Sequence, residues 1–254
     1  MKLGRGGRYL AVAVAVVALA GLTVVGTVAA KPEKVIVGEL EVEYDGGFSP
    51  KALPKNKFTP ITFFLWSKIR KVDGTHPPAL KEFQLLGDKN VKIDVGDVPM
   101  VCKSGQLQAK TSAGARKACG PALVGSGTTL VEVQFPEQPP INVKSELLAF
   151  NGGEKGGVTT LFIHAFLTAP VTAAIVTTVK IKKVKKGRYG TESIAKIPKI
   201  AGGSGSVTYF KLKFDKGVLF GKCPDGRLQA NGTAVFADST KASATVVRPC
   251  TPKG

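Results

Sequence analysis

Four acids occupy alternate positions near the start of the chain, at Glu39, Glu41, Glu43 and Asp45. Because side chains alternate between the two faces of a strand, the four carboxylates would share one face. Several oxygen ligands suit a hard cation such as calcium, although calcium loops place their acids on turns. A cross-strand ladder with the similarly spaced Lys211 and Lys213 is a second interpretation. The sequence favours the third, a solvated strand face.

A basic run supplies six cations in close succession: Lys180, Lys182, Lys183, Lys185, Lys186 and Arg188. Outside a cell, such a run can dock on an anionic wall polymer or on a membrane surface, where each lysine contributes about 1 kcal/mol near charged lipid. The same run could instead protect an exposed edge strand from pairing with a second molecule. The six residues are our predicted anion-binding site, and edge protection is the competing interpretation.

The four cysteines form two local pairs in the sequence, Cys102 with Cys119 and Cys223 with Cys250. Four cysteines allow three pairings, and loop closure favours partners that are near in sequence. The C-x2-C spacing typical of zinc sites is absent from the sequence, and no histidine lies near any of the cysteines. We therefore expect two structural disulfides, which form in oxidising compartments.

The sequence lacks the marker motifs of several enzyme classes, including the G-x-S-x-G elbow and the phosphate-binding glycine motifs. The two histidines, His76 and His164, are too few for a three-histidine zinc site. Two carboxylates such as Asp94 and Asp97 could serve a glycoside hydrolase, but any β-rich chain with 18 acids offers such pairs. The sequence favours a non-enzymatic protein, with no catalytic residue, metal or cofactor predicted. A carboxylate-dependent hydrolase is the alternative.

From Val35 onward, apolar and polar residues alternate with a period of two, and Gly, Pro, Asn and Asp residues lie between the alternating segments. This pattern predicts an all-β fold, an antiparallel β-sandwich with little helix. The expected strands are 35–37, 39–45, 59–69, 129–135, 146–150, 160–167, 171–184, 207–214, 228–236 and 242–247. Ser112–Ala118 is the best helix candidate, and Trp66, in a long apolar run, is expected in the core.

A short internal similarity relates residues 102–109 to residues 223–230, each beginning at a cysteine. Two halves built alike, each closed by one disulfide, would produce it, and so would coincidence, because a cysteine followed by a turn and a strand favours such residues. A two-lobed sandwich is therefore a variant of the predicted fold, and residues 31–254 are otherwise expected to form one extracytoplasmic domain.

The first 30 residues have the pattern of an export signal. Lys2, Arg5 and Arg8 precede an uncharged apolar stretch, which ends in small residues at Val28–Ala30. This predicts either a cleaved signal peptide or an uncleaved membrane anchor, with the rest of the chain outside the membrane. Cleavage would lower the formal net charge from +18 to +15. An exported chain does not routinely meet nucleic acid, so the basic surplus points to anionic wall polymer or lipid headgroups. The alternative interpretation is that the charge serves solubility alone.

Four segments at loops and strand ends form a recognisable set: 48–54, 73–80, 119–125 and 197–199. Together they resemble uncharacterised exported proteins of soil actinobacteria. The resemblance implies residence in the envelope or outside the cell and no activity. Together with the charge, it leads to the hypothesis of a secreted or extracytoplasmic, non-enzymatic protein that binds an anionic envelope component.

Overall fold

The structure, a computed structural model, describes residues 31–170 and 172–254. The predicted signal peptide or anchor, residues 1–30, lies outside the described residues. The strands are β1 (Glu33–Val37), β2 (Leu40–Ser49), β3 (Ala52–Pro54), β4 (Thr59–Lys71), β5 (Leu80–Asp88), β6 (Val91–Ile93), β7 (Leu123–Val133), β8 (Ile141–Lys155), β9 (Val158–Leu167), β10 (Ala173–Lys186), β11 (Tyr189–Lys196), β12 (Gly205–Gly221), β13 (Arg227–Phe236), β14 (Lys241–Pro249) and β15 (Thr251–Lys253). The α-helices are α1 (Ser104–Leu107) and α2 (Ser112–Cys119).

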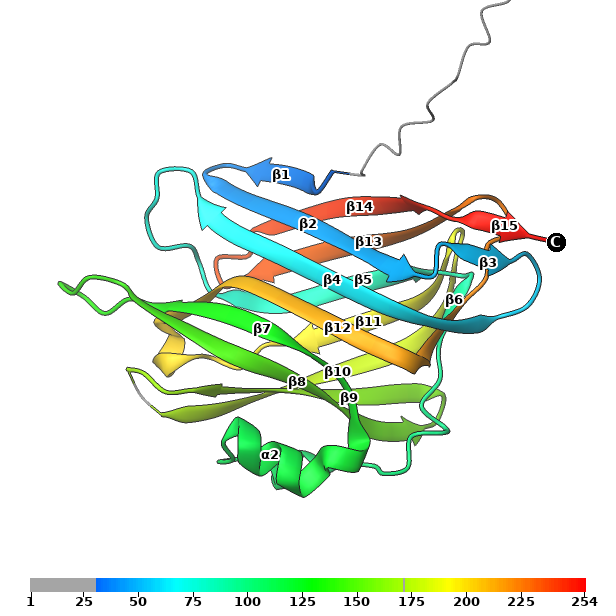
Figure 1. Ribbon diagram of the computed structural model, residues 1–254. Coiled ribbons are helices and arrows are strands. Elements are labelled where there is room, and N and C mark those ends of the chain that lie inside the picture. Colours follow the sequence, from blue (N-terminus) through cyan, green and yellow to red (C-terminus); the bar gives the residue numbers. More distant parts are fainter. Residues whose placement is uncertain (1–30, 171) are drawn as a thin grey trace, which may run out of the picture.

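One antiparallel sheet contains all of these strands except β3 and β15, which pair with each other. Its order is β1-β2-β4-β12-β7-β8-β9-β10-β11-β5-β13-β14, with β6 paired to β12. The sheet curls until its two ends approach, which gives a nearly closed, barrel-like sandwich (Figure 1). The predicted antiparallel all-β fold with little helix is therefore confirmed.

The last strand of the sheet, β14, meets the other end of the sheet at β1 and β2, and side chains connect it to β2 across this seam. The Tyr44 hydroxyl donates to the carbonyl of Ala242 at 2.6 Å and accepts from the amide of Ala234 at 3.3 Å. Farther along, Arg248 Nε donates to the carbonyl of Gly46 at 2.8 Å. A buried tyrosine and a buried arginine therefore hold together two strands that share no recorded backbone ladder within the described residues.

Ionisation of Tyr44 is expected to destabilise the seam at alkaline pH. Burial raises the pKa of Tyr44 to about 12 from an ordinary value of 10. The folded state therefore holds the phenolic proton of Tyr44 more tightly than the unfolded state does. The protonated side chain contributes to the free energy of unfolding in full below pH 10, and this contribution is lost between pH 10 and 12. The loss should be on the order of 2–3 kcal/mol. Urea unfolding across this range should show wild type losing more free energy of unfolding than Tyr44→Phe, which is less stable at pH 7 by about 1–2 kcal/mol. Parallel curves for the two proteins would contradict this role.

Both predicted disulfides are present, Cys102 with Cys119 and Cys223 with Cys250. The first joins the two ends of a helical segment, which packs on the outer face of β8 and β9 (Figure 1) and fully buries Leu148 and Phe150 beneath it. The predicted helix is confirmed as α2, which begins where the Thr111 side chain accepts from the amide of Gly114. Two disulfides indicate an oxidising, extracytoplasmic environment.

The internal similarity between residues 102–109 and residues 223–230 is not reflected in the fold. The first segment contains α1, whereas the second leads into β13. One continuous sheet path replaces two equivalent halves, so the explanation by repeated halves was wrong. Within the described residues, no helix has the length and apolar character needed to cross a membrane.

Candidate functional site

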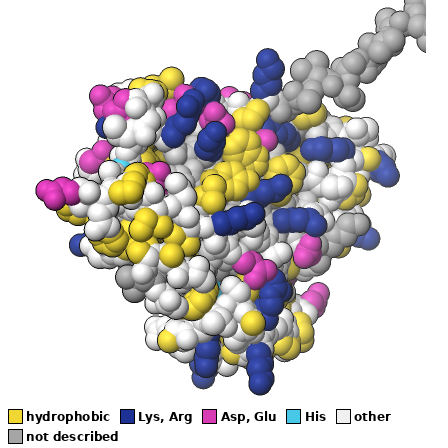
Figure 2. All heavy atoms as spheres, turned by 60° about the vertical axis from the view of Figure 1, so that its left-hand side comes forward, with side chains coloured by type: hydrophobic (Ala, Val, Ile, Leu, Met, Phe, Trp, Pro, Cys, Tyr) yellow, Lys and Arg dark blue, Asp and Glu magenta, His cyan; other side chains and the backbone are white. Residues whose placement is uncertain are grey.

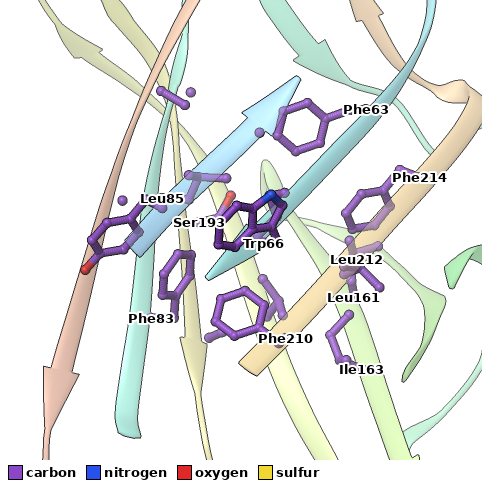
Figure 3. A pocket seen from close by; sticks show the side chains of 18 of the residues that line it. Phe63, Trp66, Phe83, Leu85, Leu161, Ile163, Ser193, Phe210, Leu212 and Phe214 are labelled. Atoms are coloured by element: carbon purple, nitrogen blue, oxygen red, sulfur yellow. The ribbon is translucent and has the colours of Figure 1, made fainter. Parts of the chain in front are cut away.

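The interior of the sandwich contains an apolar cavity of about 290 Å³. Phe63, Leu65, Ile163 and Phe210 face this interior, yet each of them is only half-buried. A fully packed core would bury such side chains almost completely. Figure 3 shows aromatic and aliphatic side chains of β4, β9 and β12 around the same space. The interior cavity is therefore a hollow in the core.

Small side chains on one wall explain why the cavity exists. The inward-facing residues of β11 are Thr191, Ser193 and Ala195, and those in the middle of β13 are Ala230 and Gly232. The opposite wall, formed by β4 and β12, carries phenylalanine and leucine. Large residues on one side do not extend far enough to meet small ones on the other, so the space between them stays unfilled.

An aromatic row crosses the interior beside the cavity. The rings of Tyr44 and Phe83 have centroids 6.3 Å apart, and Phe83 meets Phe210 edge-on at 5.1 Å. A Cβ atom at Gly232 would lie 3.2 Å from the Tyr44 ring and 3.4 Å from that of Phe83. The absence of a side chain at this position therefore lets the two rings pack against β13.

The charged groups at the cavity boundary are already paired. Asp45 forms an ion pair with Arg248, and its other oxygen accepts from the indole of Trp66 at 3.2 Å. Asp88, whose side chain is 0% exposed, accepts from Arg188 Nε at 2.7 Å. Thr177, Thr191 and Ser193 add uncharged hydroxyl groups to the lining. The site therefore offers apolar surface and neutral polar groups, without an unpaired charge from these residues.

Glu41, Glu43 and Asp45 lie on one face of β2, as predicted, whereas Glu39 lies in the turn between β1 and β2. Cations other than the expected ones pair with all four acids. Lys71 pairs with Glu39, Arg70 and Lys34 pair with Glu41, Lys34 also reaches Glu43, and Arg248 pairs with Asp45. The hydrogen bond from Arg70 holds the pKa of Glu41 below its usual value. The ladder to Lys211 and Lys213 is wrong because β4 lies between β2 and β12.

The solvated interpretation of the acid row is also wrong at Glu41, whose side chain is buried. Its carboxylate is covered because two long cationic side chains lie over it. Within the described residues, there is no group of three or more His, Cys, Asp or Glu side chains suited to a metal ion.

The six residues of the basic run have different surroundings in the structure, and most of them already bond to a neighbouring side chain. Lys182 and Lys186 both pair with Glu192 of β11, and their hydrogen bonds lower the pKa of that carboxyl group. Lys180 donates to Thr160 at 3.0 Å, and Arg188 pairs with Asp88 and Asp225. Lys183 and Lys185 make no ion pair with the part of the chain that the structure describes.

Edge protection explains only part of the basic run. Strand β10 has a neighbour on both sides from Thr178 to Lys182, namely β9 and β11. Only residues 183–186 extend beyond the end of β9, with β11 alone beside them. The edge interpretation is therefore wrong for the first half of the run. The sequence alone could not show that a strand with so many lysines lies inside a sheet.

A row of polar side chains, not predicted as a unit, lies at one end of the sandwich. His76 Nδ1 is 2.6 Å from Glu132 Oε1, and its Nε2 is 3.1 Å from Ser206 Oγ. This order resembles the acid, histidine and serine of a hydrolase. However, Ser206 is 1% exposed and donates its one hydroxyl proton to the carbonyl of Pro77 at 2.6 Å. The row therefore fastens the loop between β4 and β5 onto β7 and β12, beside a groove of about 860 Å³.

His164, the other histidine, faces the helical segment. It is fully buried, and its Nε2 lies 2.9 Å from the carbonyl of Lys110. Burial lowers the pKa of His164. His164 is therefore a hydrogen-bonded residue of the outer layer and is not among the residues that line the interior cavity.

Trp66 is where the prediction of the core was wrong. Phe63 and Leu65 face the interior, whereas Trp66 is half-buried on the alternate strand face, in register with Asp45 and Lys211. It borders the interior cavity only at its edge (Figure 3). The long apolar run hides the alternation because both faces carry large apolar residues. The signal that could have revealed the interior cavity was instead the small residues at alternate positions of β11 and β13.

Comparison of the chain with protein-family models, curated proteins and solved structures gives no match. The resemblance to exported actinobacterial proteins therefore stays a prediction, and the geometry of the site is what the functional argument rests on.

Proposed function

We propose that this protein is an exported, non-enzymatic binding protein that holds a neutral, apolar small molecule inside the sandwich. The observation that carries the proposal is the interior cavity of about 290 Å³ with its half-buried apolar lining. Its volume is near the lower end of the range for small-molecule pockets, about 300–1,000 Å³. Transfer of an apolar molecule from water into such a lining is favourable.

The chemistry of the lining defines the ligand class further. Asp45, Arg248 and Asp88 already have ionic partners, so a charged ligand would have to break an existing pair. The hydroxyl groups of Ser193 and Thr177 can bond to a neutral polar atom. The proposed ligand is therefore a mainly hydrocarbon molecule with at most a hydroxyl, ester or carbonyl group.

Export is the second part of the proposal. The apolar leader pattern in residues 1–30 and the two disulfides support it. Residence in the envelope or outside the cell follows from it, and the anionic component of the envelope remains a proposed partner. The hydrolase alternative gains no support from the carboxylates, because Asp45, Asp73 and Asp94 each pair with a neighbouring cation.

A substitution that fills the cavity tests the binding proposal. Ser193→Phe places a benzyl group in the interior cavity, so the affinity for the neutral fluorescent probe N-phenyl-1-naphthylamine should fall at least about tenfold. Saturable probe fluorescence of wild type measures the reference affinity.

The matched control is Ile194→Phe, which adds the same ring on the opposite face of β11. It should bind the probe as wild type does. Thermal melting shows that both variants are folded. No saturable probe binding by wild type, or equal loss in both variants, would overturn the proposal.

A further inference from the structure

The outer face of β4, β12 and β7 combines aromatic side chains with lysines. Phe64 and Trp66 of β4 lie on the strand face opposite to Phe63 and Leu65, because side chains alternate along a strand. Trp66 also borders the interior cavity at its edge, where its indole donates to Asp45. On β12, Phe210 and Leu212 face inwards, which turns Tyr209 and Lys211 outwards. We propose that this outer aromatic face, defined by Phe64, Trp66, Leu130 and Tyr209 with Lys68, Lys144 and Lys211, docks on an anionic lipid bilayer.

The strand register brings the members of this face together. Trp66 lies directly opposite Lys211, and Tyr209 lies between Lys68 of β4 and Leu130 of β7. Leu130 in turn faces Lys144 of β8. The rings of Trp66 and Tyr209 have centroids 6.3 Å apart. The centre of the face is therefore apolar, and lysines border it.

Glycine enlarges the apolar centre. A Cβ atom at Gly47 would lie 2.8 Å from the ring of Phe64. The missing side chain therefore lets this ring lie across β2. Leu130 is 37% exposed, and the three aromatic side chains are half-buried. Figure 2 shows a face on which a hydrophobic patch is bordered by lysine and arginine side chains.

The charge of the outer aromatic face is positive. Its acids have other partners: Asp45 pairs with Arg248, Glu43 with Lys34, and Glu146 with Arg116. Lys68, Lys144 and Lys211 are exposed and form no ion pair with any residue that the structure describes. These three cations therefore complement a negatively charged surface, unlike most of the run from Lys180 to Arg188.

The combination of aromatic side chains and exposed lysines on this face favours a bilayer over a soluble polyanion as the partner. Tryptophan and tyrosine settle at the headgroup level of membranes because their rings are apolar and their polar atoms stay hydrated. Lysines beside them add attraction to anionic lipid that salt screens. A hydrophilic polymer would use the lysines and leave the aromatic side chains without a role. This inference does not depend on the proposed ligand in the interior cavity.

Trp66 is the one tryptophan of the sequence, so its emission reports on the outer aromatic face and on the edge of the interior cavity that it borders. The exported protein is mixed with vesicles of phosphatidylcholine alone or with phosphatidylglycerol added. We expect sedimentation with the anionic vesicles only, together with a blue shift of Trp66 emission and quenching by brominated acyl chains. Raising the salt concentration should weaken binding. Equal binding to both vesicles, or binding without a change in Trp66 emission, would overturn the proposal.

Charge reversal locates the surface. Lys144→Glu with Lys211→Glu should weaken binding to anionic vesicles at least about tenfold. Lys183→Glu with Lys185→Glu changes the net charge equally on a different surface and should leave binding within about twofold of wild type. Lys144→Gln with Lys211→Gln gives a milder second pair whose folding is easier to retain. A larger loss from the Lys183 and Lys185 pair would refute the assignment.

Two further measurements separate this proposal from its alternatives. Ser193→Phe should dock on anionic vesicles as wild type does, because it alters only the interior. Soluble polyglutamate should not compete with the vesicles at equal charge concentration. Full competition by polyglutamate, with Trp66 emission unchanged, would instead identify an anionic polymer as the partner.

Discussion

Arg188→Met is expected to lower the free energy of unfolding by about 3–5 kcal/mol, because it leaves the buried carboxylate of Asp88 without its cation. The Asp88 side chain is 0% exposed, and Arg188 lies 2.7 Å from it. Asp88 also accepts from the amides of Asn90 and Gln229. These two bonds keep the carboxylate in place but do not supply a compensating charge. Urea unfolding at pH 7 measures the loss.

Arg116→Met is the matched control for this prediction. Its ion pair with Glu146 is exposed on both sides, so its removal should cost no more than about 1 kcal/mol. The contrast matters for function as well. Arg188 is occupied by Asp88 and Asp225, and its hydrogen bond holds the pKa of Asp225 below the usual value. If Arg188→Met were as stable as Arg116→Met, the predicted cost of leaving Asp88 without a cation would be wrong.

Removal of the disulfide between Cys223 and Cys250 by paired alanine substitutions is expected to cost about 3–4 kcal/mol. The two cysteines are 27 residues apart, and closing such a loop restricts the unfolded chain by roughly that amount. Both sulfur atoms also pack among Phe48, Leu53 and Ile61. Chemical unfolding of the variant should therefore give one cooperative transition at a lower denaturant concentration.

The disulfide between Cys102 and Cys119 serves as the comparison. Its separation of 17 residues predicts about 3 kcal/mol. Because it joins the two ends of the helical segment that contains α2, its loss should raise hydrogen exchange at α2 while the strands around the interior cavity stay protected. Equal exchange in both disulfide variants would show that the two bridges do not act locally.

Intact mass of the natural secreted product tests export and oxidation together. A cleaved leader gives the mass of residues 31–254, and reduction adds two hydrogens for each disulfide. Recovery of the full chain from the cytosol with four reduced thiols would contradict the export proposal, while leaving the cavity argument unaffected.

The fold class and the favoured pairing of the four cysteines could be predicted from the amino-acid sequence. Alternation in β2 and in the segments of β8 and β9 is a local property, because each strand places every second residue on the same face. Loop closure likewise depends on separation along the chain, so Cys102 with Cys119 and Cys223 with Cys250 could be predicted. Strands β5 and β11 and the short strands β3, β6 and β15 were not predicted. Small and polar residues conceal the apolar face of β11, and β5 mixes apolar with charged residues without strict alternation.

Contacts between side chains that are distant in sequence could not be predicted, because they follow from the order of the strands in the folded sheet. Asp88 and Arg188 are 100 residues apart, and Asp45 and Arg248 are 203 apart. No local pattern encodes such pairs, because they depend on the order of strands in the sheet. The same order turned Trp66 outwards and placed the small residues of β11 and β13 opposite the aromatic side chains of β4 and β12. A cavity is a property of facing walls, and residues that face each other across a closed sheet are distant in sequence.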